Sequence, residues 1–118
     1  MEILYPKRTT HNEMEMLMCN ALRGAGLDAR LEVRARGDKP GERNARLDLV
    51  VFRDKRAVCI VECKSWSQSY LRNQRYRQGQ NSKQMNRYRE TSGVPVFICG
   101  CLSAIEPVKQ LVLSVYNR

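Results

Sequence analysis

Apolar residues recur along this chain at spacings that predict helix, three strands, helix, strand and helix, in that order. Residues 10–23 have helical spacing and begin with Thr10 followed by Glu13, a capping-box pattern. Gly24 and Gly26 would end this helix, because glycine readily adopts the left-handed cap conformation. The stripe expected to be buried is Met14, Leu17, Met18, Ala21 and Ala25.

The strands are predicted from alternation and from runs rich in β-branched residues. Residues 29–35 alternate apolar and charged side chains, which is typical of a half-exposed strand. Residues 46–52 and 57–63 form two further strands around a short charged loop, and residues 94–101 form the last, with Pro95 near its start. An antiparallel meander followed by a crossover strand predicts an α/β fold, a mixed sheet flanked by helices.

Two later segments are expected to be helical. Residues 82–90 form one helix, ending near Ser92-Gly93, and residues 107–116 form the other, with Pro107 in its first turn. The expected buried stripe of the last helix is Val108, Leu111, Val112 and Val115. Residues 67–80 are polar and rich in Arg and Gln, so their structure is left open.

Composition sets the class of protein. The 118 residues, 1–118, suit a single domain with one modest core. The net charge is +9, and this favours a polyanionic partner, nucleic acid before a membrane. Charged residues make up 28% of the chain, and no apolar run approaches the roughly 18 residues needed to span a bilayer. We therefore expect no membrane association.

Five cysteines occur, at positions 19, 59, 63, 99 and 101. An odd number without a secretory signal near the N-terminus predicts a reducing, cytoplasmic compartment. A zinc site is the alternative, but Cys59-x3-Cys63 and Cys99-x-Cys101 are poorly spaced for zinc and lie in predicted strands.

The central pair of strands carries acids in an apolar setting. If Arg53-Asp54-Lys55-Arg56 forms the turn, one register places Asp48 opposite Val61 and another places it opposite Glu62. In the second register the two carboxylates face each other with Cβ atoms about 5 Å apart, and Lys64 shares their face. A slip of one residue separates Asp48 from Glu62. In the register with Asp48 opposite Glu62, the side chains of Val58 and Ile60 lie on the face of Glu62. Those of Cys59, Val61 and Cys63 lie on the other face.

Two adjacent carboxylates repel each other, and a hard divalent cation such as Mg²⁺ removes that cost. Mg²⁺ retains waters, and one of them could act as the nucleophile, with Lys64 orienting or deprotonating it. These are the ingredients of phosphodiester hydrolysis. The alternative is that Asp48, Glu62 and Lys64 are ordinary surface residues in exposed ion pairs, which contribute little.

The motif RLDLVVFRDKRAVCIVECKSW resembles the PD-(D/E)XK nuclease superfamily, which has the restriction-endonuclease-like fold. The resemblance covers most of the chain and is greatest to small virus-type replication–repair nucleases and Holliday-junction resolvases. It implies that Asp48, Glu62 and the Cys63 carbonyl bind Mg²⁺, or Mn²⁺ in its place, and that Lys64 assists the attacking water. Leu47 stands where the family usually has proline, at a position that varies widely.

The resemblance also implies two further catalytic residues. A glutamate of the first helix approaches the metal in many members, and Glu13 is the candidate, with Glu15 in reserve; the capping box explains Glu13 equally well. Gln84 and Tyr88 match a Gln-x-x-x-Tyr element that helps hold the lysine and the substrate, with Gln80 as a competing choice.

A basic stretch with interspersed aromatic residues runs from position 66 to 89. Arginine and lysine contact phosphates, and aromatic rings stack on bases. The candidate nucleic-acid-binding residues are Arg72, Arg75, Arg77, Lys83, Arg87 and Tyr88. A solvated helix face is the alternative. His11, the single histidine, is expected to be a surface residue near the helix cap.

The sequence therefore predicts a Mg²⁺-dependent DNA nuclease, an endonuclease acting on duplex or branched DNA. A small nuclease of this kind is expected to form a homodimer, and a larger replication–repair complex is a further expectation. The alternatives are a non-catalytic nucleic-acid-binding module and a nuclease subunit that needs a partner.

Overall fold

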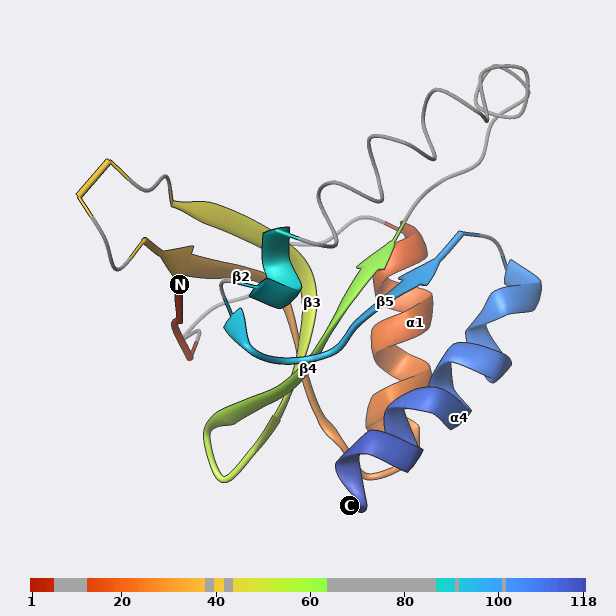
Figure 1. Cartoon of the computed structure of the whole chain (residues 1–118). Helices are drawn as coiled ribbons and strands as arrows, with labels where there is room; N and C mark the ends of the chain where they lie inside the picture. The colour runs from red at the N-terminus through yellow and green to blue at the C-terminus, as the bar shows by residue number, and fades with distance from the viewer. Residues whose placement is uncertain (6–12, 38–39, 42–43, 64–86, 91, 101) are drawn as a thin grey trace.

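Figure 1 shows a mixed sheet whose strands lie beside two helices, α1 and α4. The computed structural model describes residues 1–5, 13–37, 40–41, 44–63, 87–90, 92–100 and 102–118. The elements are β1 (Glu2–Ile3), α1 (Glu13–Gly24), β2 (Asp28–Arg36), β3 (Ala45–Arg53), β4 (Arg56–Cys63), β5 (Val96–Cys99), the 3-10 turn η1 (Leu102–Ala104) and α4 (Ile105–Tyr116).

The five strands lie in the order β1-β2-β3-β4-β5. Strands β1 to β4 pair antiparallel, and β5 pairs parallel to β4. The prediction of an α/β protein with a meander and one crossover strand is confirmed. Strand β1 was not predicted, because two residues are too few to show a period; its Ile3 pairs with Ala35.

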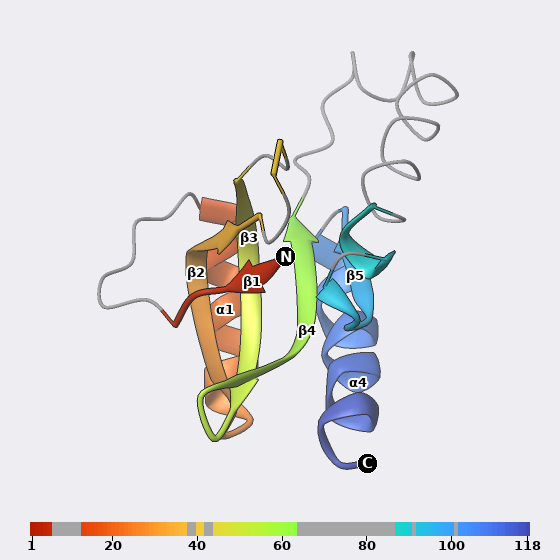
Figure 2. The same ribbon diagram turned by 60° about the vertical axis from the view of Figure 1, so that its left-hand side comes forward.

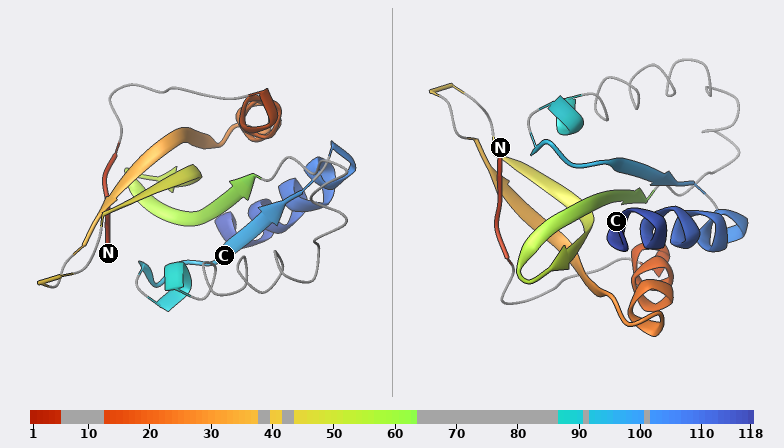
Figure 3. Two further views of the ribbon diagram at one scale, coloured as in Figure 1. Left: turned by 90° about the horizontal axis from the view of Figure 1, so that it is seen from above. Right: turned by 60° about the horizontal axis from the view of Figure 1, so that its bottom comes forward.

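Each face of the sheet has its own apolar core. Figure 2 and Figure 3 show α1 and α4 together on one face. The helix-side core contains Met18, Cys19 and Leu22 of α1, Val108 and Val112 of α4, and the sheet residues Ala29, Leu31, Leu49, Val51, Cys59, Val61, Cys63 and Cys99. The far-side core contains Val33, Ala35, Leu47, Val50, Phe52, Ile60, Tyr88 and Val96. Strands β3 and β4 are thus buried on both faces.

The predicted helix stripes are partly wrong. In α1, Leu17 is 42% exposed and Ala25 lies beyond the helix end. The buried positions are Glu15, Met18, Cys19 and Leu22, which follow the i, i+3, i+4, i+7 pattern of one helix face. The predicted stripe was chosen from the most apolar residues and therefore omitted Glu15. Helix α1 thus packs on the sheet with a different face from the one predicted. In α4, Leu111 is half exposed while Val108 and Val112 are buried.

The remaining segments agree with the prediction where they are described. Residues 87–90 of the predicted helix 82–90 are helical, and residues 82–86 lie outside the described part. Strand β5 is shorter than the predicted 94–101, although the carbonyl of Pro95 accepts a hydrogen bond from the N–H of Ile60 at 2.9 Å. Neither α1 nor α4, nor any other helix among the described residues, is long and apolar enough to cross a membrane.

Candidate functional site

The turn between β3 and β4 is tight and is followed by a bulge. Asp54 and Lys55 both have positive φ, 54° and 65°, the backbone of a two-residue type I′ hairpin turn. Phe52 pairs with Ala57 beside the turn, but Val51 pairs with Cys59. Val58 is therefore an extra residue on β4, with no partner across the hairpin.

This bulge determines which of the two open registers occurs. Beyond it Val50 pairs with Ile60 and Leu49 with Val61, so the next step along the strands sets Asp48 opposite Glu62. The expected faces are confirmed for Cys59, Val61 and Cys63, which pack in the helix-side core, and for Ile60, which packs in the far-side core. Val58 belongs to neither core, because the bulge interrupts the alternation there.

Asp48 and Glu62 make hydrogen bonds across the two strands. The backbone N–H of Cys63 donates to Oδ2 of Asp48 at 2.9 Å, and the N–H of Asp48 points to Oε1 of Glu62 at a long 3.5 Å. Glu62 is only 3% exposed, and Asp48 is half-buried. Glu62 is therefore not the surface residue that the alternative interpretation required.

Glu15 adds a third carboxylate from α1. It is 2% exposed and lies on the helix face that packs against the sheet. Glu13 is the first residue of α1, but its side chain lies outside the described part. The choice between Glu13 and Glu15 as the helix acid thus remains a prediction, with burial now described for Glu15.

The thiol of Cys63 responds to all three acids. Burial raises its pKa most, and the neighbouring Cys99 thiol and the carboxylates of Asp48, Glu15 and Glu62 raise it further. The carboxylates of Asp48, Glu15 and Glu62 therefore all lie close enough to the Cys63 thiol, at the end of β4, to affect its pKa. Burial alone raises the pKa of Cys59 to about 12, so both thiols are protonated at neutral pH. Cys19, Cys59, Cys63 and Cys99 are all free and buried.

The donor chemistry suits a hard cation, but the ligand set is incomplete. Carboxylate oxygens are the ligands that Mg²⁺ prefers, and Mg²⁺ usually needs only one or two of them because it keeps several waters. Within the described residues no group of three or more His, Cys, Asp or Glu side chains is arranged to hold a metal. Asp48 and Glu62 are the pair that fits, and the role expected for the Cys63 carbonyl remains a prediction.

Several predicted residues lie outside the described part. They are Lys64, Gln84 and its competitor Gln80, the basic residues Arg72, Arg75, Arg77 and Lys83, and also His11 and Cys101. Arg87 is described and exposed. Tyr88 is 3% exposed in the far-side core, with the guanidinium of Arg87 5.3 Å from its ring centre, so this ring presents no free face to a base.

A second charged region was not predicted from the sequence. Beyond Glu32, residues 33–36 of β2 and 45–47 of β3 extend the sheet, with β1 paired along the outer side of β2. This part, together with Asn44, is here called the β2–β3 arm, and it reaches away from α1 and α4 (Figures 1 and 3). Arg34, Arg36 and Arg46 lie on its exposed face. The alternation of apolar and charged residues in 29–35 indicated a charged, exposed strand face. It did not indicate which strand would pair with this one.

Glu32 marks the start of the arm. It has a left-handed φ of 51°, which is costly for a residue with a side chain. It lies level with Asp48, because Leu31 pairs with Leu49 and Val33 pairs with Leu47. Leu31 packs in the helix-side core and Val33 in the far-side core, so β2 changes the face it buries at Glu32.

No protein-family model, curated protein or solved structure matches this chain. The site must therefore be interpreted from its own geometry.

Proposed function

We propose that this protein is a Mg²⁺-dependent DNA nuclease that hydrolyses phosphodiester bonds. The observation that carries the proposal is the opposition of Asp48 and Glu62 on β3 and β4, with the N–H of Cys63 donating to the Asp48 carboxylate and the N–H of Asp48 directed at the Glu62 carboxylate. Of the two registers open to the hairpin, only this one brings the two acids of the nuclease motif together.

The arrangement of the sheet supports the proposal. A helix precedes the meander, the two acidic strands are neighbours at the centre of the sheet, and β5 runs parallel to β4. The restriction-endonuclease-like fold of the PD-(D/E)XK superfamily is the fold we propose for this arrangement.

Asp48 and Glu62 would hold the cation, and Glu15 supplies a further acid nearby. When bound, Mg²⁺ would acidify a water and stabilise negative charge on the phosphate. The hydrogen bond from Cys63 fixes the orientation of the Asp48 carboxylate, which lowers the cost of ordering it. Lys64, which follows Cys63 directly, is proposed to assist the attacking water.

The test uses isosteric variants, Asp48→Asn and Glu62→Gln, assayed on linear duplex, single strand, flap and four-way junction DNA. Each variant should lose cleavage by about a thousandfold or more, since a ligand charge is removed while the packing volume is kept. DNA binding in EDTA should be unchanged. The matched control is Glu106→Gln, which removes an exposed acid of α4 that pairs with Lys109.

Cleavage that survives in both variants would overturn the site assignment. Wild-type protein that binds DNA but cuts none of the substrates with Mg²⁺ or Mn²⁺ would instead indicate a non-catalytic binding module or a subunit that needs a partner. The proposed homodimer is checked separately by light scattering.

A further inference from the structure

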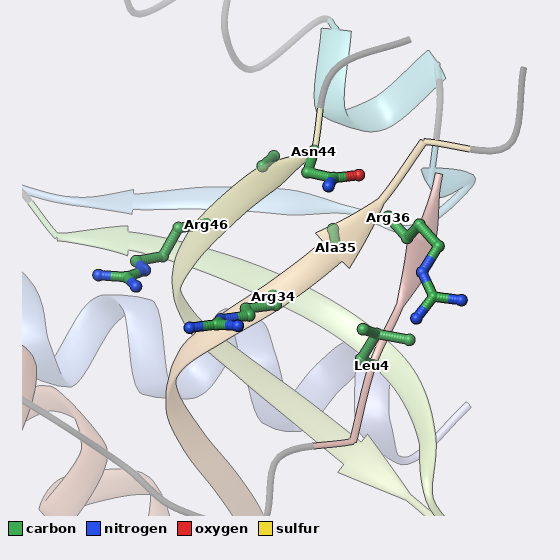
Figure 4. Close-up of a pocket in the computed structure, with 7 residues that line it drawn as sticks. Leu4, Arg34, Ala35, Arg36, Asn44 and Arg46 are labelled. Atoms are coloured by element: carbon green, nitrogen blue, oxygen red, sulfur yellow. The ribbon is translucent and has the colours of Figure 1, made fainter. Parts of the chain in front are cut away.

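A pocket of about 420 Å³ lies on the β2–β3 arm, outside the site described above. Figure 4 shows that its polar lining comes from Arg34, Arg36, Asn44 and Arg46, with Leu4 beside them. The side chains of Arg34 and Arg46 extend in the same direction from neighbouring strands. The surface formed by these three arginines and Asn44 is called the arginine surface below.

The arginine surface contains a like-charged pair. Arg34 and Arg46 are direct partners across antiparallel strands, which sets their Cβ atoms about 5 Å apart. Like charges in this position destabilise a sheet. Arg46 has only a loose contact with Glu32, at 3.8 Å, and its side chain is 60% exposed. An anion bound between Arg34 and Arg46 would turn this repulsion into attraction.

The third arginine extends the positive charge along the strand. Arg36 lies two residues beyond Arg34 on the same face of β2, about 7 Å away. In the part of the chain that the structure describes, neither Arg34 nor Arg36 forms an ion pair. Three exposed cations in a row suit a ligand with several negative groups along its length, such as a sugar–phosphate backbone, better than a single ion.

The position of the surface connects it to the candidate active site. Arg46 lies two residues before Asp48 on β3, also about 7 Å along the strand. Guanidinium groups there would contact phosphates close to the one held at Asp48 and Glu62. Asn44 closes the arm by accepting a hydrogen bond from the N–H of Gly37 at 3.2 Å, which keeps the two strands together at this end.

We propose that the arginine surface binds the sugar–phosphate backbone of the DNA substrate beside the phosphate that is cut. This inference rests on the proposed nuclease function for its choice of DNA. Contacts of this kind position the nucleic acid without reading its sequence.

The test compares two double variants that remove the same charge. Arg34→Ala/Arg46→Ala removes the like-charged pair, while Arg56→Ala/Arg118→Ala removes two exposed arginines beside the β3–β4 turn and at the C-terminus, at the other end of the molecule (Figure 1). Binding of duplex DNA is measured in EDTA across a range of salt concentrations. The first variant should bind at least tenfold more weakly, and its plot of log affinity against log salt should be less steep by about two. The control should stay close to wild type.

Circular dichroism and thermal melting check that both variants fold, and Arg34→Gln/Arg46→Gln replaces the first variant if it does not. Equal affinity and equal salt slope in the two double variants would overturn the proposal. So would a loss of binding to phosphatidylserine vesicles with DNA binding unchanged, since that result assigns the surface to a membrane.

Because binding is measured without Mg²⁺, the outcome is independent of cleavage. If the arginine variant loses DNA binding while wild-type protein cuts nothing, the arginine surface stands and the nuclease proposal fails. If wild-type protein cuts DNA and the arginine variant binds DNA normally, the nuclease proposal stands and the proposal for the arginine surface fails.

Discussion

The β3–β4 hairpin and the β2–β3 arm share strand β3 but arrange charge in opposite ways. In the hairpin, Glu62 is buried and Asp48 is half-buried opposite it. In the arm, Arg34 and Arg46 face each other across the strands and are exposed. The sign of the charge changes within two residues of β3, between Arg46 and Asp48.

Burial makes these two like-charged pairs respond to different conditions. Repulsion between exposed arginines is weakened by water and by salt, so the arm tolerates it without a ligand. Repulsion between the buried Glu62 and the half-buried Asp48 is screened less, and a divalent cation in direct contact with both would remove it. The hairpin should therefore depend on divalent cations, and the arm should depend on ionic strength.

One-residue deletions in β4 have the largest expected effect, and they test whether the bulge at Val58 sets the pairing of the hairpin. Deleting Ile60, which is fully buried, should cost about 2–5 kcal/mol in the free energy of unfolding, because its place in the far-side core is left empty or poorly filled. Deleting Val58 shortens β4 equally but removes the one residue without a cross-strand partner. The hairpin then closes regularly with Asp48 still opposite Glu62, so the free energy of unfolding should change by about 1 kcal/mol or less.

Urea denaturation measures both deletions, and cleavage assays check that the Val58 deletion keeps its activity. If deleting Val58 destabilises the protein as much as deleting Ile60 does, the bulge is not where the pairing places it.

These deletions also show why the sequence left the register open. A two-residue turn and a buried strand are both readable from residues 46–63, and the predicted strand limits lie within one residue of those observed. The register of the two strands could not be predicted from the sequence. Strand β4 is apolar on both faces from Cys59 to Val61, so its pattern also fits a register shifted by one residue. The bulge at Val58 decides it, and no residue type at that position signals a bulge.

Glu15 was named from the sequence as the reserve for the helix acid, but its burial and the arginine surface were not predicted, for other physical reasons. A glutamate is rarely buried, so counting apolar residues assigned the α1 stripe to Leu17 instead. The pair of Arg34 and Arg46 depends on which strand lies beside which, and residues 12 apart in the sequence carry no local sign of that contact. The elements were thus predictable from local periodicity, whereas the charge clusters depend on tertiary pairing.

Substituting Glu15 tests whether the acidic region extends to α1. Glu15→Gln keeps the packing volume and should lower cleavage by about tenfold to a hundredfold, since a nearby carboxylate affects how firmly the site holds its cation. Glu13→Gln, two residues away on the same helix, serves as its partner variant and should change cleavage by less than about twofold. The Mg²⁺ concentration that gives half-maximal cleavage is measured for both. A larger effect of Glu13→Gln would transfer the role to that residue.

Glu32 lies where the hairpin and the arm meet, and two substitutions there give the smallest expected effect. Its φ of 51° suits glycine but strains any residue with a Cβ atom. Glu32→Gly and Glu32→Ala both remove the contact with Arg46, so that loss cancels when the two are compared. Glu32→Ala retains the strain, and it should be less stable than Glu32→Gly by about 1 kcal/mol, as measured by urea denaturation. Equal stabilities would mean that β2 passes from one core to the other without the left-handed residue, and the arm would then have no fixed orientation relative to the carboxylates.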